Sequence, residues 1–241
     1  MSPDNDILLA AVVACFSVVH SIFGIGLLLF GTPTLLLLGF DFAEAIAALL
    51  PCSLMIDMQQ LRKGLPTTSG FVKHLFVLTL PFVCIGLFAV LQGLNAAYVT
   101  YAIGAMLLLV GLIRCSKRAM LALQYGVRNH HIPYMAAMGF IHGLSNMGGG
   151  LLAVLAGSRS QDKEEIRRLI ASGYAMFAAT QLLMLLAFSP TSFELSRLYL
   201  VPVAALVYLV SNNIFKRLSG QQFQHLLTGL IIVYGTLVIL K

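Results

Sequence analysis

Apolar residues dominate nearly the whole chain, and short polar segments interrupt them at irregular intervals. Apolar runs longer than 18 residues recur between Ile7 and Leu240, and a helix of about 20 apolar residues spans the hydrocarbon core of a bilayer. Alternation of apolar and polar residues with a period of two, the mark of a membrane β-barrel, does not occur. The pattern therefore predicts an all-α polytopic membrane protein built as a helical bundle.

The first apolar stretch, residues 7–38, contains 32 residues without a charged side chain. It is too long for one straight span and too short for two spans and a loop, because each span needs about 20 residues. The sequence Gly24-Ile25-Gly26 divides it into predicted helices at residues 7–23 and 27–39, both shorter than the hydrocarbon core. We therefore expect the turn between them to lie inside the membrane, in a re-entrant hairpin or a broken helix.

A second interruption is the triplet Gly148-Gly149-Gly150, between short apolar segments at residues 132–147 and 151–157. Each glycine inside a helix costs about 1 kcal/mol relative to alanine. In hydrocarbon, irregular backbone is tolerated only where protein buries it or where it lines a water-filled cavity. We expect the three glycines to break a membrane helix and the freed backbone to bind a ligand.

The other predicted helices are plainer spans with polar connections between them. Asp41 and Glu44 begin a helix that runs to about Leu61. The charged run at residues 162–168, which we expect to be a solvated loop and helix start, begins another that ends near Phe188. Further helices are expected at residues 74–92, 97–113, 198–215 and 223–240.

The predicted elements repeat in the same order on either side of a polar linker at residues 114–131. A shift of 122 positions pairs His20 with His142, Gly26 with Gly148 and Gln59 with Gln181. Each half holds five elements, so the second half would enter the membrane in the opposite orientation. Residues 1–131 and 132–241 are thus predicted to be two inverted repeats that form one membrane domain, a plan typical of secondary transporters.

Composition and charge place the chain in a membrane and give it an orientation. Of 241 residues, 59% are hydrophobic and 10% are charged, against about 25% charged in soluble domains. With the N-terminus outside, all fifteen basic residues except Arg197 and Lys241 fall in inside loops. The positive-inside rule therefore predicts that both termini lie outside the cell (inner) membrane. The same distribution accounts for the net charge of +6 without nucleic acid.

Polar residues and glycines at the two interruptions are the candidate substrate-binding residues. Free N–H groups at a helix N-terminus favour an anion. An imidazole inside the membrane could donate to that anion or take up a coupling proton. Hydroxyl and amide groups could serve an oxyanion without burying a charge. The candidates are His20, Gly24, Gly26, Gln59, His142, Ser145, Asn146, Gly148, Gly149, Gly150 and Gln181.

Structural interpretations of these residues stay open beside the functional ones. Glycines also let helices approach closely, as Gly139 and Gly143 would at their GxxxG spacing. Either histidine could be a neutral side chain bonded to a backbone carbonyl, and the amides could join helices. Asp57 lies five residues before Arg62, which favours an ion pair at the membrane interface over proton carriage.

Two segments of the chain resemble the glycine motifs of the TauE/SafE sulfite-exporter family. These are residues 30–39 (FGTPTLLLLG) after the first interruption and residues 145–152 (SNMGGGLL) at the second. Residues 173–181 fit the same pattern, while the first copy lacks the full glycine triplet and Leu155 stands where a proline is common. The resemblance covers essentially the whole chain. It implies a secondary transporter of sulfur-containing anions such as sulfite or organosulfonates.

The leading hypothesis is therefore a secondary transporter of a small anion. No Walker motif for ATP and no CxxC or His/Cys cluster occurs, so no cofactor or metal is expected. The expected partners are the anion, the lipid bilayer and a coupling proton or other ion, with a homo-oligomer left open.

Two alternatives come from other classes of protein. One is an intramembrane enzyme with Ser145 as nucleophile and His20 or His142 as base, although no carboxylate is expected near either imidazole. The other is a non-transporting membrane assembly factor.

Overall fold

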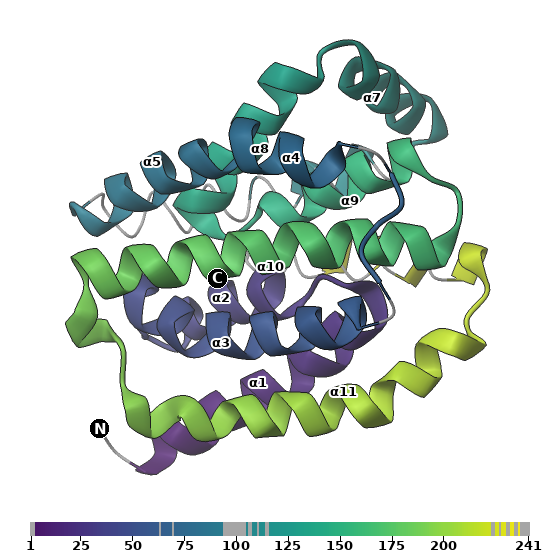
Figure 1. Cartoon of the computed structure of the whole chain (residues 1–241). Coiled ribbons are helices and arrows are strands. Elements are labelled where there is room, and N and C mark those ends of the chain that lie inside the picture. Colours follow the sequence, from purple (N-terminus) through teal and green to yellow (C-terminus); the bar gives the residue numbers. More distant parts are fainter. Residues whose placement is uncertain are drawn as a thin grey trace.

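The computed structural model describes residues 3–62, 64–68, 70–93, 105, 108–109, 111–113, 116–222, 225–226, 228–229, 232–233 and 236. Every element in this part of the chain is helical. A long helix, α10 (Lys163–Phe188), crosses the middle of the bundle (Figure 1). On one side lie α4 (Phe71–Leu78), α5 (Leu80–Leu91), α8 (His131–Ser145) and α9 (Gly148–Arg159). On the other lie α1 (Pro3–Phe23), α2 (Leu27–Leu37), α3 (Phe42–Leu61) and α11 (Leu200–Arg217).

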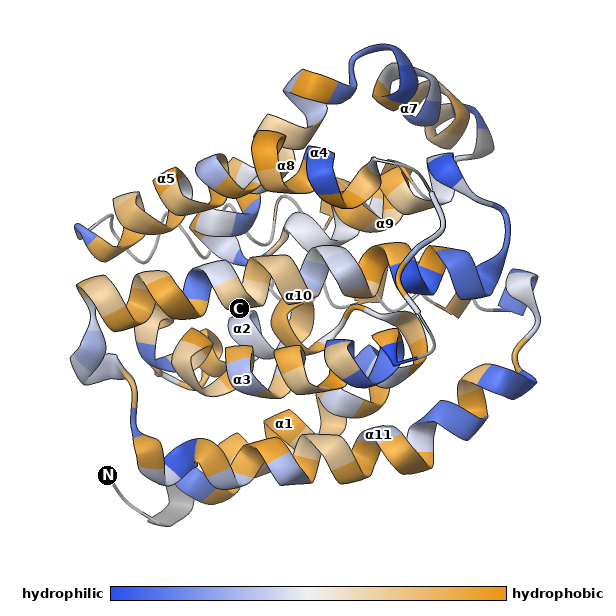
Figure 2. Ribbon diagram, in the orientation of Figure 1, coloured by the Kyte–Doolittle hydropathy of each residue, from blue (hydrophilic) through white to orange (hydrophobic). Residues whose placement is uncertain are grey.

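Five helical segments among the described residues are long and apolar enough to cross a membrane. Large apolar side chains face outward on them, as at Phe76, Leu183 and Val210. Hydrophilic segments lie mainly in α7 (Lys117–Asn129) and at the ends of the long helices (Figure 2). The all-α polytopic membrane fold is thus confirmed. The five segments are Asp6–Phe23, Phe42–Leu61, Phe71–Leu91, Lys163–Phe188 and Leu195–Arg217.

Several predicted boundaries agree closely with the observed helices. The helix expected to end at Leu61 is α3, and the one expected to end near Phe188 is α10. The helix expected at residues 74–92 is divided into α4 and α5 at Thr79, two residues before Pro81, which has no N–H to donate. The helices expected at residues 97–113 and 223–240 lie largely outside the described residues. The inverted relation of the two halves stays a prediction.

The linker expected at residues 114–131 contains a helix, α7. The Ser116 hydroxyl accepts a hydrogen bond from the N–H of Ala119 (3.3 Å), which caps its first turn. Arg128 near its end donates to the carbonyl of Ser158 at the end of α9 (3.0 Å). Alanine, leucine, glutamine and arginine, all good helix formers, occupy most of this segment, so its polarity reflects an amphipathic helix instead of an irregular loop.

The charged run at residues 162–168 begins α10 as expected, with Asp162 exposed at its N-cap, but two of its charges are not solvated. Glu165 is only 6% exposed and Arg167 only 4%. One carboxylate oxygen of Glu165 accepts hydrogen bonds from the N–H and hydroxyl groups of both Thr67 and Thr68, at 2.7–3.1 Å. Arg167 donates to Asn212 of α11 (2.9 Å). The expectation of a solvated run is wrong for these two charges, because the α3–α4 loop and α11 cover them.

Glycines allow α5 and α8 to pack backbone against backbone. A Cβ at Gly139 would overlap the carbonyl oxygen of Thr79, and one at Gly143 would overlap that of Val83. On the facing helix, a Cβ at Gly86 would overlap the carbonyl oxygen of Phe140. This is the close approach that the GxxxG spacing favours.

Replacing Gly139 by alanine is expected to destabilise this interface. The added methyl group has no space beside the Thr79 carbonyl, and overpacking of a core typically costs about 1–3 kcal/mol. The melting temperature in detergent should fall. Gly126→Ala in α7 is the control, because no atom lies within 4 Å of its added Cβ. Equal melting temperatures for Gly139→Ala and the parent would contradict the packing role.

Candidate functional site

The first break separates α1 from α2 over residues 24–26. Gly24 has φ +72° and Gly26 has φ +152°, backbone conformations that residues other than glycine rarely adopt. A Cβ at Gly26 would also lie 2.7 Å from Cγ1 of Val19 and 2.9 Å from the backbone nitrogen of His20. Glycine is therefore required here both by backbone conformation and by space, and the predicted interruption is confirmed.

The second break lies between α8 and α9 at Asn146 and Met147. Asn146 has φ +61°, and its N–H donates to the carbonyl of His142 (2.8 Å), an arrangement that ends α8. We expected the three glycines to form the break, but they form the first turn of α9. The reason is that Asn146 can adopt the left-handed conformation itself.

The glycines of α9 serve close packing against two ring side chains. A Cβ at Gly148 would lie 3.0 Å from Nδ1 of His142. A Cβ at Gly149 would overlap the hydroxyl of Tyr174 in α10. The positively polarised N-terminus of α9 therefore directly adjoins an imidazole and a phenol.

His20 at the end of α1 is bonded to Asp57 of α3. Its Nε2 lies 2.9 Å from Oδ1 of Asp57, and both side chains are fully buried. Ser53 donates to the other carboxylate oxygen (3.3 Å), and Gln60 donates to the backbone carbonyl of His20 (3.0 Å).

The expected ion pair between Asp57 and Arg62 is wrong. Five residues along a helix correspond to a rotation of about 140° beyond a full turn, so the two side chains leave α3 on different faces. The Asp57 side chain faces α1 instead, where it meets His20. The expectation that no carboxylate lies near either histidine is therefore wrong for His20.

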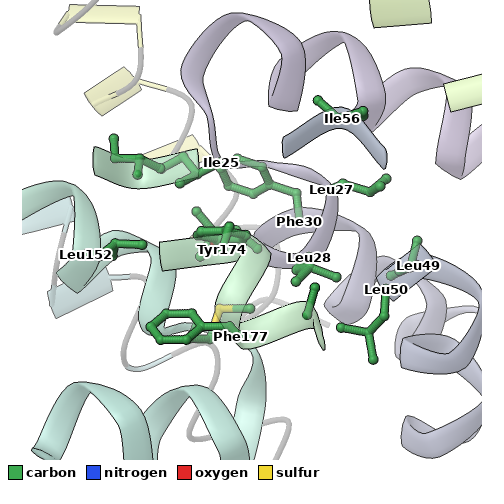
Figure 3. Close-up of a cluster of buried hydrophobic side chains, with 14 of the residues drawn as sticks. Ile25, Leu27, Leu28, Phe30, Leu49, Leu50, Ile56, Leu152, Tyr174 and Phe177 are labelled. Atoms are coloured by element: carbon green, nitrogen blue, oxygen red, sulfur yellow. The ribbon is translucent and has the colours of Figure 1, made fainter. Parts of the chain in front are cut away.

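Tyr174 of α10 lies between the two histidines. Its ring centroid is 5.5 Å from that of His20 and 5.9 Å from that of His142, in edge-on arrangements. Phe177, one turn further along α10, stacks against His142 at 4.3 Å. Tyr174 and Phe177 project from α10 beside the apolar side chains of α2 and α9 (Figure 3).

Tyr174 was not among the predicted site residues. A signal was nevertheless present, because it precedes Gln181 by seven residues, and this spacing places the two on one helix face.

Several polar atoms of this cluster are buried without a hydrogen-bond partner among the described residues. They are Nδ1 of His20 and the Tyr174 hydroxyl, together with both ring nitrogens of His142 and Oε1 of Gln181, two side chains that interact weakly with each other. These four side chains are fully buried. Most buried polar atoms in proteins have a partner, so the grouping of these atoms makes this cluster the candidate site.

Amide side chains connect the second break to α2 and α10. Gln181 donates to Oδ1 of Asn146 (2.8 Å), and Asn146 donates to the hydroxyl of Thr32 in α2 (3.0 Å). The structure therefore brings two predicted residues, His20 and His142, to Tyr174, and joins two others, Asn146 and Gln181, to each other.

Two other predicted residues have local roles. The Ser145 hydroxyl donates to the carbonyl of Ile141 (2.7 Å) and accepts from the N–H of Met147 (3.3 Å), so it supports the break. Gln59 is buried, and its backbone carbonyl accepts a hydrogen bond from the Tyr208 hydroxyl (3.3 Å). The amide side chain that braces the first break is that of the next residue, Gln60.

A bundle of long apolar helices, with helix breaks and buried polar groups in its interior, defines a polytopic membrane protein. The chain matches the family model described as Sulfite exporter TauE/SafE over residues 8–238 and belongs to this family. The resemblance of its motifs is thus confirmed, and the chain is a membrane transport protein. No curated protein and no solved structure gives a significant match to it.

The left-handed conformation of Asn146 gives a test of the second break. Asn146→Gly and Asn146→Ala both remove the hydrogen bonds to Thr32 and Gln181, but only alanine is strained at φ +61°. A left-handed alanine costs about 1–2 kcal/mol. The alanine variant should therefore have the lower melting temperature of the two. A lower value for the glycine variant would contradict the geometry of the break.

Proposed function

We propose that the protein is a secondary transporter of a small anion, specifically a sulfur-containing oxyanion such as sulfite or an organosulfonate. The observation that carries the proposal is the group of unpartnered polar atoms between the two helix breaks, on His20, Tyr174, His142 and Gln181. Membership of the TauE/SafE family supports the sulfur chemistry of the substrate.

The chemistry of the cluster suits an oxyanion. A tyrosine hydroxyl and imidazole N–H groups donate hydrogen bonds, and an oxyanion presents several acceptor oxygens. The first turn of α9 adds backbone N–H groups at the positive end of a helix dipole, beside the Tyr174 hydroxyl. The substrate would therefore be bound by dipoles and hydrogen bonds, with its charge compensated without a buried lysine or arginine.

The burial of the cluster fits a transport cycle. His20, His142, Asn146 and Tyr174 have no exposed surface, so a ligand reaches them only when helices move. A site that is closed between two openings is what alternating access requires. The short helices α2 and α9 each begin at a break, and we expect these two elements to move.

The alternative classes have weaker support. A serine nucleophile needs a base, but the Ser145 hydroxyl donates to a carbonyl of its own helix. An assembly factor would have no need of unpartnered polar atoms in the interior. We therefore propose that the protein is not an enzyme and requires no cofactor.

Tyr174→Phe tests the anion site. If the hydroxyl binds the substrate, its loss removes a hydrogen bond to a charged group, worth about 1.5–3 kcal/mol, and lowers affinity by about one to two powers of ten. The melting temperature should stay equal or rise, because the hydroxyl has no protein partner among the described residues. Uptake of [³⁵S]sulfite into proteoliposomes measures the transport effect, and a detergent melting curve measures stability.

Tyr134→Phe is the matched control for this substitution. The Tyr134 hydroxyl donates to the carbonyl of Leu151 (2.7 Å), so its removal should lower the melting temperature and leave affinity unchanged. Parental affinity for Tyr174→Phe would remove the hydroxyl from the site. Absence of uptake by the parent, with sulfite and with an organosulfonate, would contradict the proposed function.

We further propose that both termini lie outside the cell membrane. Basic residues follow α3, begin α10 and end α11, and these three helix ends lie at the right of Figure 1, on the side of α7. The positive-inside rule favours the cytoplasm for this end. The basic residues concerned are Arg62, Arg167, Arg168, Lys216 and Arg217.

A single cysteine at the start of α7 tests this orientation. Lys117→Cys, in a background with the four native cysteines replaced by serine, should react with an impermeant maleimide only after the cells are permeabilised. A cysteine at Leu195, at the opposite end of the bundle and 74% exposed, should react in intact cells. The reverse pattern of labelling would invert the proposed topology.

A further inference from the structure

The Asp57–His20 pair has a feature that anion binding alone does not explain. A carboxylate is the least suitable group to bury beside an anion, yet Asp57 is fully buried one imidazole away from the unpartnered atoms of the cluster. Ionisable groups inside membrane helices are rare and usually functional. We propose that the Asp57–His20 pair binds one proton together with each anion, so that transport is proton-coupled. This proposal rests on the proposed function.

The hydrogen bond between the two side chains fixes where the proton must go. When Asp57 is ionised its carboxylate can only accept, so in this state Nε2 of His20 carries the hydrogen of the 2.9 Å bond. In the neutral imidazole, Nδ1 is then an acceptor and cannot bind an anion. A second proton, at Nδ1, turns this atom into a donor and changes the net charge of the pair from −1 to zero.

The surroundings of the pair leave His20 as the group that links it to the substrate. Ser53 donates to Asp57 from the same helix, and Tyr174 of α10 faces His20 edge-on. The short helix α2 carries no titratable side chain. Three further titratable groups on elements packed against α3 bond elsewhere. Arg167 bonds to Asn212, Arg197 to Glu44 and Tyr208 to the backbone carbonyl of Gln59.

Proton and anion therefore favour each other's binding. Without the proton, an anion near Nδ1 of His20 meets a lone pair and a net negative charge. With it, the same atom donates a hydrogen bond and the charge is compensated. Because linkage is reciprocal, bound anion also holds the proton on His20. His142 has no carboxylate partner among the described residues, so it can act as a neutral donor throughout the cycle.

The experiment compares exchange with proton-driven uptake in proteoliposomes of the full chain. The probe is [³⁵S]methanesulfonate, a sulfonate whose charge does not change between pH 5 and pH 8, with [³⁵S]sulfite as a second probe. The parent should exchange the anion when its concentration is equal on both sides of the membrane. It should also accumulate the anion at least fivefold when the lumen is more alkaline by one pH unit. Its apparent affinity should fall up to tenfold per pH unit on the alkaline side.

Asp57→Asn should separate the two activities. Unlike a carboxylate, the asparagine amide can donate to Nε2, so neutral His20 can carry its hydrogen on Nδ1 and bind the anion without a second proton. Exchange should therefore continue within about threefold of the parent. Accumulation driven by the pH gradient should be lost, and affinity should vary less than twofold between pH 5.5 and pH 8. Glu44→Gln is the matched control, a carboxylate of the same helix that pairs with Arg197 (2.7 Å) away from the cluster. It should retain both activities.

Proton movement in the parent gives a second test that does not depend on folding of the variant. A pH-sensitive dye in the lumen should report about one proton for each methanesulfonate taken up. Anion uptake without proton movement, or gradient-driven accumulation by Asp57→Asn equal to that of the parent, would overturn the proton-coupling proposal and leave the transporter proposal standing. A parent that exchanges neither probe would instead overturn the transporter proposal.

Discussion

The structure depends on one constraint: a continuous helix must cover the exposed backbone at two helix breaks. Backbone N–H and C=O groups released by a break cannot remain exposed to hydrocarbon, so another part of the protein must cover them. Helix α10 does this at both breaks. Its Ile170 side chain would lie 3.2 Å from a Cβ at Gly24, and its Tyr174 hydroxyl takes the space of a side chain at Gly149. The two breaks are therefore held against one helix.

The same closeness creates the polar cluster. Because glycine lets Tyr174 approach the first turn of α9, the phenol comes to lie between His20 and His142, which end the helices before the two breaks. The amides of Asn146 and Gln181 then join the second break to α10. The close packing of these glycines and the proposed binding of an anion are therefore linked. The glycines position the side chains that would bind the anion.

The sequence was sufficient to predict the membrane class, most helix boundaries and both interruptions, since these depend on local composition and on glycine. It was not sufficient to predict which helix faces meet. Asp57 pairs with a residue 37 positions away and not with its neighbour Arg62. Glu165 is buried by Thr67 and Thr68, almost 100 positions away. Helical periodicity defines the face of each side chain, but only the packing of the bundle decides what that face contacts.

The distribution of hydrogen bonds distinguishes structural from functional polar groups. At the end of the bundle, the buried carboxylate of Glu165 receives four hydrogen bonds from a loop and holds that loop to α10. In the interior, the Tyr174 hydroxyl has no hydrogen-bond partner among the described residues. An unsatisfied buried polar group costs about 1–3 kcal/mol, and phenylalanine or leucine would fill the same space without that cost. Stability alone would therefore favour an apolar residue at this position, which accords with the proposed role of the hydroxyl in binding the transported anion.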